Sequence, residues 1–300
     1  MNNWQVLVTG SAGFVGRYMV DELEHRGAEV YTLDLKVEGD MVQILPQIDK
    51  RFDLVVHLAY HVGGRQAIDG SPMNLAANAQ LDAALFDWAL RTRQKRVLYF
   101  SSSAAYPVNY QNRKRPVLLK EDMIHPGQAQ EPDANYGWAK LTGERMAYAA
   151  IASGLQTFIV RPFSGFAEDQ DLDYPFPSLA KRARERKNPF EIWGDAGQVR
   201  DWIHITDVVN GALAVVKQDV DTPVNLCTGI GTSMAKLANM MCREIDHHPE
   251  IEVLKDMPMG VKYRVGDARL FESIYTPRID LEWAVKRAMR WVAPAAKPRP

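Results

Sequence analysis

The glycine-rich segment at residues 10–16 constrains the fold of this chain more than any other sequence feature. It joins an apolar, β-prone run at residues 4–8 to a stretch of helical composition at residues 18–26. A glycine turn between a strand and a helix leaves backbone N–H groups free at the helix N-terminus, where they and the helix dipole favour a pyrophosphate. The segment therefore predicts either a nucleotide-binding turn or an ordinary tight turn, and alone it does not separate the two.

Each of the three glycines has a separate task if the turn binds a nucleotide. Gly10 permits the tight turn, Gly13 lets the backbone approach the phosphates, and Gly16 lets the helix pack closely on the strand. The spacing is G-x-x-G-x-x-G rather than G-x-G-x-x-G. We expect cofactor contacts along this turn, from Gly10, Ala12, Gly13, Phe14, Val15 and Gly16.

An acidic residue at the end of the next strand narrows the choice of nucleotide. Residues 29–33 have the composition of a strand, and Asp34 follows them directly. An acid at this place in a dinucleotide-binding unit accepts hydrogen bonds from the adenosine ribose hydroxyls. Its charge repels a 2′-phosphate, so Asp34 favours NAD over NADP, although the nearby Lys36 weakens that preference. The alternative is a solvated carboxylate at a strand end.

Strand and helix signals alternate through the first half of the chain. Short apolar runs at residues 54–58, 96–100 and 156–160 are typical of buried strands, and helical patterns lie at residues 79–90 and 137–153. This alternation predicts right-handed crossovers and a parallel sheet. We expect an α/β fold: a doubly wound parallel-sheet Rossmann domain with a smaller mixed α/β C-terminal substrate lobe. The predicted boundaries are 1–162 for the NAD-binding domain, with 202–223 returning to it, and 163–201 and 224–300 for the lobe.

A tyrosine and a lysine stand four residues apart at the start of the helix before the strand at 156–160. Tyr136 and Lys140 therefore share one helix face. A phenol is a poor base at neutral pH, but a nearby cation favours its phenolate form. Ser102 follows the strand at 96–100, at the sheet edge where ligands bind in open α/β folds. The alternatives are a surface pair on a helix and a serine-containing turn.

The overall composition excludes several function classes. The 300 residues are 46% hydrophobic and 24% charged, with a formal net charge of −1, so electrostatics give no case for nucleic acid or membrane as a partner. Cys227 and Cys242 are too few for a disulfide framework and lack partners at metal-site spacing, so we expect no metal. There is no signal-like apolar stretch after Met1, and we expect a cytoplasmic protein.

Several motifs in a fixed order resemble a known family. They are the glycine turn with Asp34, His57-Leu58-Ala59, Ser101-Ser102-Ser103, Tyr136 with Lys140, Arg161-Pro162, the R-D-W-I-H-I-T-D-V run at 200–208, and N-L-C-T-G at 225–229. Together they resemble the extended short-chain dehydrogenase/reductase group of NAD-dependent nucleotide-sugar epimerases and dehydratases, over most of the chain. The altered glycine spacing is also the form that this family uses.

The resemblance implies roles for individual residues. Tyr136 would be the acid/base for a sugar hydroxyl, and Lys140 would hold the cofactor ribose and lower the pKa of the tyrosine. Ser102 would aid proton transfer, with Ser103 as the alternative. Further cofactor contacts are implied for Asp40, Met41, Leu58, Ala59, Asn78 and Pro162. Substrate contacts are implied for Ser103, Ser164, Arg200 and Arg264, the two arginines on the nucleotide diphosphate. The family also implies a homodimer through the helices at 79–90 and 137–153, although Leu81, Leu85 and Trp88 fit a monomer core equally well.

Departures from the family pattern narrow the reaction. Relatives that dehydrate carry T-D-E-V-Y where this chain has Ser102-Ser103-Ala104-Ala105-Tyr106, so both acids are absent. The similar GDP-mannose 3,5-epimerases use a cysteine where Ala104 stands. What remains is the minimum set for moving a hydride on and off one carbon. We therefore expect a nucleotide-sugar 4-epimerase with a recycled NAD. The alternatives are an NAD(P)H-dependent reductase of a keto sugar or other carbonyl, and a non-catalytic NAD-sensing protein.

Overall fold

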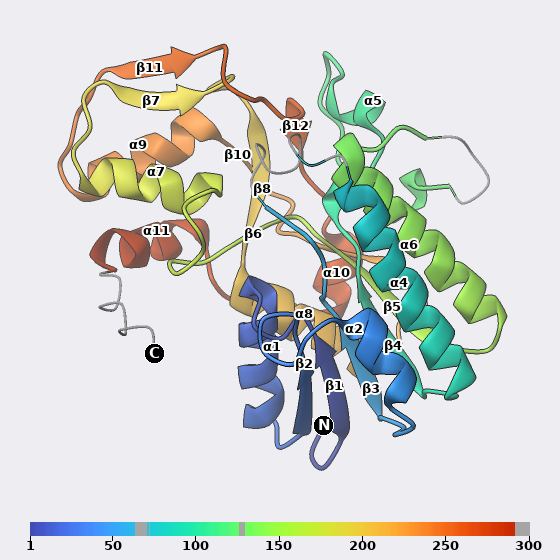
Figure 1. Cartoon of the computed structure of the whole chain (residues 1–300). Helices are drawn as coiled ribbons and strands as arrows, with labels where there is room; N and C mark the ends of the chain where they lie inside the picture. Colours follow the sequence, from blue (N-terminus) through green and yellow to red (C-terminus); the bar gives the residue numbers. More distant parts are fainter. Residues whose placement is uncertain (64–70, 72, 126–129, 292–300) are drawn as a thin grey trace.

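Six parallel strands form the central sheet of the computed structural model, which describes residues 1–63, 71, 73–125 and 130–291 (Figure 1). The strand order is β2-β1-β3-β4-β5-β9, and each neighbouring pair is parallel. The strands are β1 (Gln5–Thr9), β2 (Glu29–Leu33), β3 (Leu54–His57), β4 (Arg96–Phe100), β5 (Gln156–Pro162) and β9 (Val224–Leu226). The predicted fold class, a doubly wound Rossmann domain, is confirmed.

Helices cover both faces of this sheet because alternate strand residues point to opposite sides. Val6 and Val8 of β1 pack with α1 (Phe14–His25), α8 (Ile205–Lys217) and α10 (Arg269–Ile274). Leu7, between them, packs in a second core with α4 (Asn74–Arg91), α6 (Ala134–Ala152) and the short α2 (Met41–Ile44). The two helices α4 and α6 lie side by side in Figure 1 and carry the side chains of the site.

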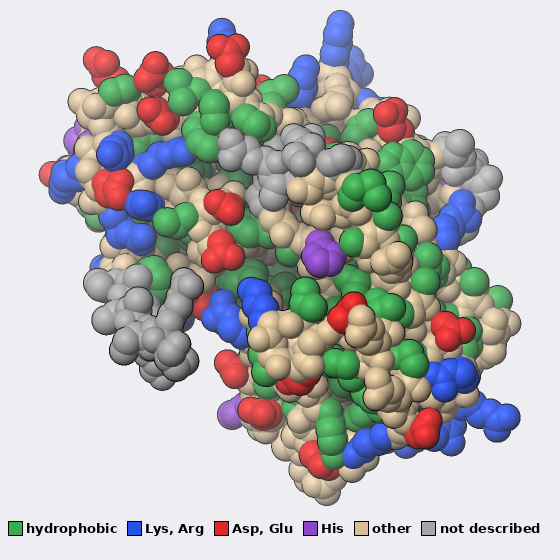
Figure 2. All heavy atoms as spheres, in the orientation of Figure 1, with side chains coloured by type: hydrophobic (Ala, Val, Ile, Leu, Met, Phe, Trp, Pro, Cys, Tyr) green, Lys and Arg blue, Asp and Glu red, His purple; other side chains and the backbone are tan. Residues whose placement is uncertain are grey.

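A smaller lobe stands above the carboxyl ends of the sheet strands (Figure 1). Its β-strands are β6 (Ser164–Phe166), β7 (Phe190–Trp193), β8 (Val199–His204), β10 (Gly231–Ser233), β11 (Ile251–Leu254) and β12 (Tyr263–Arg264). Its helices are α7 (Pro175–Arg184), α9 (Met234–Glu244) and α11 (Leu281–Arg290), which share an apolar core. Acidic and basic side chains intermingle over this lobe, so that face shows no surface of a single sign (Figure 2).

Among the described residues, the short segments between these elements are three 3-10 turns and one helical turn. They are Leu45–Gln47, Ser103–Ala105, Glu121–Met123 and α5 (Val108–Gln111). In the part of the chain that the structure describes, no helix is both long and apolar enough to cross a membrane.

Several element bounds differ from the sequence expectation, and the helix predicted at 79–90, for example, begins at Asn74. Helix α6 begins at Ala134, three residues before the predicted start, so Tyr136 lies inside its first turn. The lobe was expected to resume at residue 224, whereas β9 begins there and pairs with β5 in the central sheet. Three residues are too short a run for periodicity to reveal a strand. The predicted domain boundaries otherwise stay predictions.

Candidate functional site

The turn between β1 and α1 can be built only with glycines at its two ends. Gly10 adopts φ +71°, and a Cβ added there would lie 2.6 Å from the backbone nitrogen of Ala59. A Cβ on Gly16 would overlap the carbonyl oxygen of Gly10. Gly13 caps α1, where no side chain occupies the N-terminal N–H groups. Such an end of a twelve-residue helix suits the pyrophosphate of NAD.

Asp34 lies where the sequence analysis placed it, at the end of β2, and it is buried against the glycine turn. Its Oδ2 accepts a hydrogen bond from Ala12 N at 3.0 Å, and Oδ1 accepts from Lys36 N at 2.9 Å. Asp40 caps α2 by accepting from Val42 N at 2.9 Å. The donor set of the turn and this carboxylate fit a dinucleotide, and the contact of Asp34 with the adenosine ribose stays a prediction.

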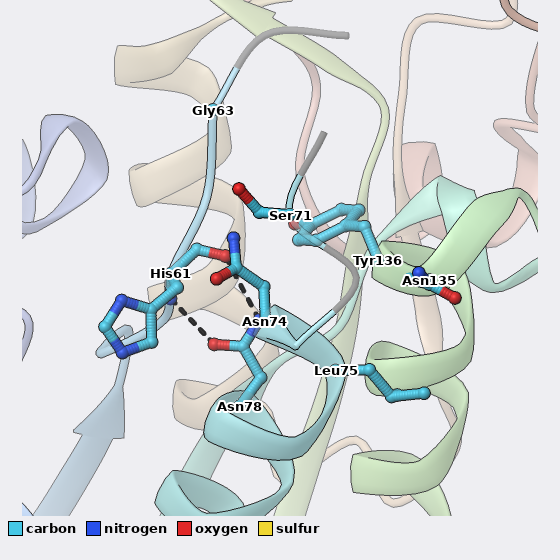
Figure 3. A pocket seen from close by; sticks show the side chains of 8 residues that line it. All are labelled: His61, Gly63, Ser71, Asn74, Leu75, Asn78, Asn135 and Tyr136. Atoms are coloured by element: carbon cyan, nitrogen blue, oxygen red, sulfur yellow. Dashed lines mark hydrogen bonds between the residues drawn. The ribbon is translucent and has the colours of Figure 1, made fainter. Parts of the chain in front are cut away.

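The loop after β3 is held by Asn78, a buried residue of α4. Its Oδ1 accepts from His61 N at 2.7 Å and its Nδ2 donates to His61 O at 3.1 Å (Figure 3). Both residues line a small cavity of about 10 Å³ together with Tyr136. The predicted cofactor residue Asn78 therefore shapes the site by fixing the backbone beside Tyr136.

Ser102 lies close to Tyr136. Ser102 follows β4 and accepts from Ala104 N at 3.1 Å, and its side chain is near enough to the phenol to influence it. Loss of solvent around the phenol raises the pKa of Tyr136, the neighbouring Tyr174 adds to this, and Ser102 and Arg264 oppose it. The effect of Lys140 on the pKa of Tyr136 that the resemblance implies stays a prediction.

Lys140 is one helical turn from Tyr136, but its ammonium group points into the protein. Its Nζ donates to Phe100 O at 2.7 Å and lies 3.2 Å from the ring centroid of Tyr60. Burial lowers the pKa of Lys140 to about 8, while the carboxylates of Asp82 and Glu144 act in the opposite direction.

The predicted substrate residues lie at the junction of sheet and lobe. Ser103 is buried in the 3-10 turn after β4, and Ser164 starts β6 just after Pro162 ends β5. Arg200 of β8 donates to Val199 O at 2.8 Å and to Gln198 Oε1 at 3.0 Å. That these three residues contact the substrate stays a prediction.

Arg264 of β12 is tied to the helix that carries Tyr136. It donates to Asp133 Oδ2 at 2.6 Å and to Gln111 Oε1 at 2.6 Å. Asp133 caps α6 three residues before Tyr136. The lobe therefore reaches the start of the catalytic helix through Arg264, and the predicted diphosphate contact of this arginine stays a prediction.

The two acids of the R-D-W-I-H-I-T-D-V run hold chain segments in place. Asp201 accepts from Thr228 N at 2.8 Å and Gly229 N at 2.9 Å, which joins this run to the N-L-C-T-G motif. Burial raises the pKa of Asp201 to about 6, against the pull of these bonds. Asp207 accepts from the Tyr275 hydroxyl at 2.7 Å. Much of this signature is therefore structural.

Sequence reasoning missed three residues near the site: Tyr60, Asp82 and Tyr174. Tyr60 carries the face on which Lys140 rests, and Tyr174 lies close enough to Tyr136 to raise its pKa. Asp82 had a detectable signal, because it shares helical spacing with the apolar Leu85 and Ala89. An acidic residue on the apolar face of a helix predicts a buried carboxylate that needs hydrogen-bond partners. Nothing local marks the other two, which meet the site only through the fold.

Comparisons with known proteins agree with this geometry. The model of the "NAD dependent epimerase/dehydratase family" matches residues 6–227. The chain is 25% identical to a dTDP-4-dehydro-6-deoxy-D-allose reductase of Streptomyces sp, covering 95% of each chain. It is also 25% identical to a putative UDP-glucose 4-epimerase of Methanocaldococcus jannaschii, covering 96% of this chain and 98% of the other.

A solved structure of MoeE5 in complex with UDP-glucose and NAD superposes with a TM-score of 0.83. The identity is 27%, and 96% of this chain and 98% of that one are covered. The family model spans most of the chain and includes the glycine turn, Ser102, Tyr136 and Lys140. The chain belongs to the NAD-dependent epimerase/dehydratase family, and NAD is its cofactor.

Proposed function

We propose that this protein is a nucleotide-sugar epimerase that inverts the C4 hydroxyl through a transient 4-keto sugar. The observation that carries the proposal is that Ser102 lies beside Tyr136, with Lys140 one helical turn further along α6 and alanines at 104 and 105. Those two alanines are buried, so no carboxylate is available there to eliminate water from the sugar. The putative UDP-glucose 4-epimerase among the relatives supports this reaction.

The side chains divide the proton chemistry between them. The glycine turn and Asp34 would hold NAD, and the bound cofactor would supply the hydride chemistry at C4. Tyr136 takes the proton of the C4 hydroxyl as the sugar is oxidised and gives it back on reduction. The Ser102 hydroxyl, close to the phenol, stabilises its deprotonated form and offers the proton a path. Because the cofactor is restored in each turnover, the reaction needs no second substrate.

Reduction of a 4-keto sugar is the second candidate, and one observation favours it. The relative from Streptomyces sp is such a reductase. The two reactions differ in whether the nicotinamide is consumed.

A panel of UDP-, GDP-, dTDP- and CDP-sugars tests the proposal. Purified protein with NAD bound should form C4 epimers without added cofactor. Failure to turn over any of these sugars while NAD stays bound would overturn the epimerase assignment. Stoichiometric loss of NAD(P)H absorbance with a keto sugar would identify the reductase instead.

Substitution of the catalytic phenol separates both enzymes from a non-catalytic NAD sensor. Tyr136→Phe should lower kcat by about 10²–10⁴-fold, because general acid–base catalysis contributes about that much. Tyr148→Phe, a partly buried tyrosine on the same helix, is the matched control and should keep its rate. A biological activity that survives Tyr136→Phe would favour the sensor.

A further inference from the structure

A carboxylate is buried between α4 and α6 and is hydrogen-bonded by three side chains. Asp82 has no exposed surface. It accepts from His57 Nε2 at 3.1 Å, from the Tyr60 hydroxyl at 2.9 Å and from the Tyr99 hydroxyl at 3.1 Å. Removing a carboxylate from water costs several kcal/mol unless a positive charge and hydrogen bonds repay it. The three bonds satisfy its oxygens but bring no full positive charge.

The chain makes room for this carboxylate at some expense. Gly143 of α6 lies where any side chain would collide, since an added Cβ would overlap the Tyr99 hydroxyl and the Asp82 carboxylate. A glycine inside a helix costs about 0.5–1 kcal/mol relative to alanine. Its presence here lets the acid of α4 reach the helix that carries Lys140.

Lys140 is a buried cation, and its hydrogen bonds and ion pairs within the described part of the chain include no carboxylate. Its ammonium donates to Phe100 O and rests on the Tyr60 ring. The acid of α6 itself, Glu144, is already held by two hydrogen bonds from Arg161, at 2.8 and 2.7 Å. The pairing of Glu144 with Arg161 leaves Asp82 to balance the charge of Lys140.

We propose that Asp82 is the counter-ion of Lys140, and that Tyr60 is the positioning residue that joins them. The Tyr60 hydroxyl donates to Asp82 while its ring face carries the ammonium. A phenol that donates to a carboxylate gains electron density in its ring, which strengthens the attraction of that face for a cation. Tyr60 thus passes the charge of Asp82 on to Lys140, without direct contact between acid and base.

The other groups that face Lys140 do not replace Asp82. Burial lowers the pKa of His57, which keeps its ring neutral, and its Nδ1 meets the Thr9 hydroxyl at 2.8 Å. The carboxylate accepts from Nε2–H, so Nδ1 accepts from Thr9. Burial also raises the pKa of Tyr60 and of Tyr99, so both phenols remain donors.

The inference rests on the proposed role of Lys140 as the charged partner of the cofactor and Tyr136. If Asp82 supplies the balancing charge, its loss makes the ammonium give up its proton at lower pH. The enzyme would then lose activity and NAD affinity at a lower alkaline pH, with the acid side of the profile unchanged. A residue with a merely structural role would lower both sides together.

Titration of the Lys140 ¹³Cε resonance in lysine-labelled protein tests the charge directly. Lys140→Met assigns the signal, and we expect a midpoint of about 8 in the parent protein. Asp82→Asn should lower this midpoint by about one unit, a tenfold change in the ratio of charged to neutral form. An unchanged midpoint in a folded Asp82→Asn protein would overturn the proposal.

Two further variants keep the test decisive. Asp87→Asn makes the same chemical change on the exposed face of α4 and should leave the midpoint unchanged. Tyr60→Phe keeps the ring but loses the bond to Asp82, so it should lower the midpoint by a smaller amount even if Asp82→Asn fails to fold. No shift in Tyr60→Phe would exclude Tyr60 as the link.

The titration needs no turnover, so the two proposals can fail separately. A shifted midpoint in a protein that epimerises no sugar would leave the charge pairing standing and remove the proposed function. Turnover with an unshifted midpoint would do the reverse.

Discussion

Two buried cations lie at helix α6, Lys140 on the helix and Arg161 on the neighbouring β5, and their hydrogen-bond partners differ. Arg161 of β5 donates through Nε and both terminal nitrogens to Glu144, the Tyr106 hydroxyl and the backbone oxygen of Glu121. Lys140, one turn away from Glu144, has one backbone carbonyl and the rings of Tyr60 and, further away, Tyr99. The guanidinium is locked by a fixed fork of bonds, whereas the ammonium keeps donors to spare.

The two cations also differ in the direction of their pKa shifts. The carboxylate beside Arg161 raises the pKa of its guanidinium further, so this group never titrates under ordinary conditions. The pKa of Lys140 falls to about 8, within reach of physiological pH. Arginine suits fixed buried pairs and lysine suits groups whose proton matters. Variants at the two cations should therefore change the free energy of unfolding by different amounts.

Breaking the arginine pair should have the largest effect. Glu144→Ala leaves Arg161 charged and buried without its partner, which costs about 3–5 kcal/mol. Denaturant unfolding at neutral pH measures this loss. Arg145→Ala removes an exposed charge from the next position of α6 and should change stability by less than about 0.5 kcal/mol. Equal losses in the two variants would contradict the structural role of the pair.

A neutral contact of the same arginine should matter less. The Tyr106 hydroxyl donates to the buried Asn225 Oδ1 at 2.7 Å and accepts from Arg161 at 3.1 Å. Tyr106→Phe leaves both groups without this partner, and a buried unpaired polar group costs about 1–3 kcal/mol. We expect about 2 kcal/mol by the same unfolding measurement. A neutral result would mean that water replaces the hydroxyl.

The lysine should give stability an unusual dependence on pH. Its pKa is about 8 when folded and about 10.4 when unfolded, so the unfolded chain binds more protons between these values. Stability therefore rises with pH, by about 1.5 kcal/mol from pH 8 to 9.5. Buried tyrosines reverse the trend above about pH 10, where the unfolded phenols ionise. The contribution of Lys140 is measured as the difference between the parent protein and Lys140→Met in the slope of unfolding free energy against pH.

Lys140→Met itself should show the smallest change in stability. At pH 7 the substitution removes the cost of burying a charge but also removes a hydrogen bond and a cation–π contact, each worth about 1 kcal/mol. We expect a net gain of about 1 kcal/mol, accompanied by loss of most activity. A large destabilisation would place Lys140 with Arg161 as a structural cation.

The sequence predicted the sheet better than the lobe, for a physical reason. The segments at residues 29–33 and 96–100 are rich in aliphatic and aromatic residues that favour strands, and their bounds match β2 and β4. The short strands β6, β9 and β12 owe their existence to partners far away in the chain, so no local pattern reveals them. Strands with a regular local pattern can be predicted from sequence, whereas strands that depend on distant partners cannot.

The candidate site divides in the same way. The glycine turn and the spacing of Tyr136 and Lys140 are short-range features, and the structure brings these groups to one edge of the sheet. The orientation of the Lys140 ammonium depends on Tyr60 and on Asp82, which come from two other elements. The direction of the Tyr136 pKa shift depends on burial, which no spacing rule reports.

The two acids of the 200–208 run also bear on how the whole chain folds. Asp201 accepts from Gly266 N at 3.3 Å, and Asp207 accepts from Arg278 N at 3.0 Å and Ile279 N at 2.9 Å. Each buried carboxylate would lose its donors if the last quarter of the chain detached. The sheet and the lobe are therefore cooperative: neither has a complete set of internal bonds alone, and a single melting transition is the expected signature of their mutual dependence.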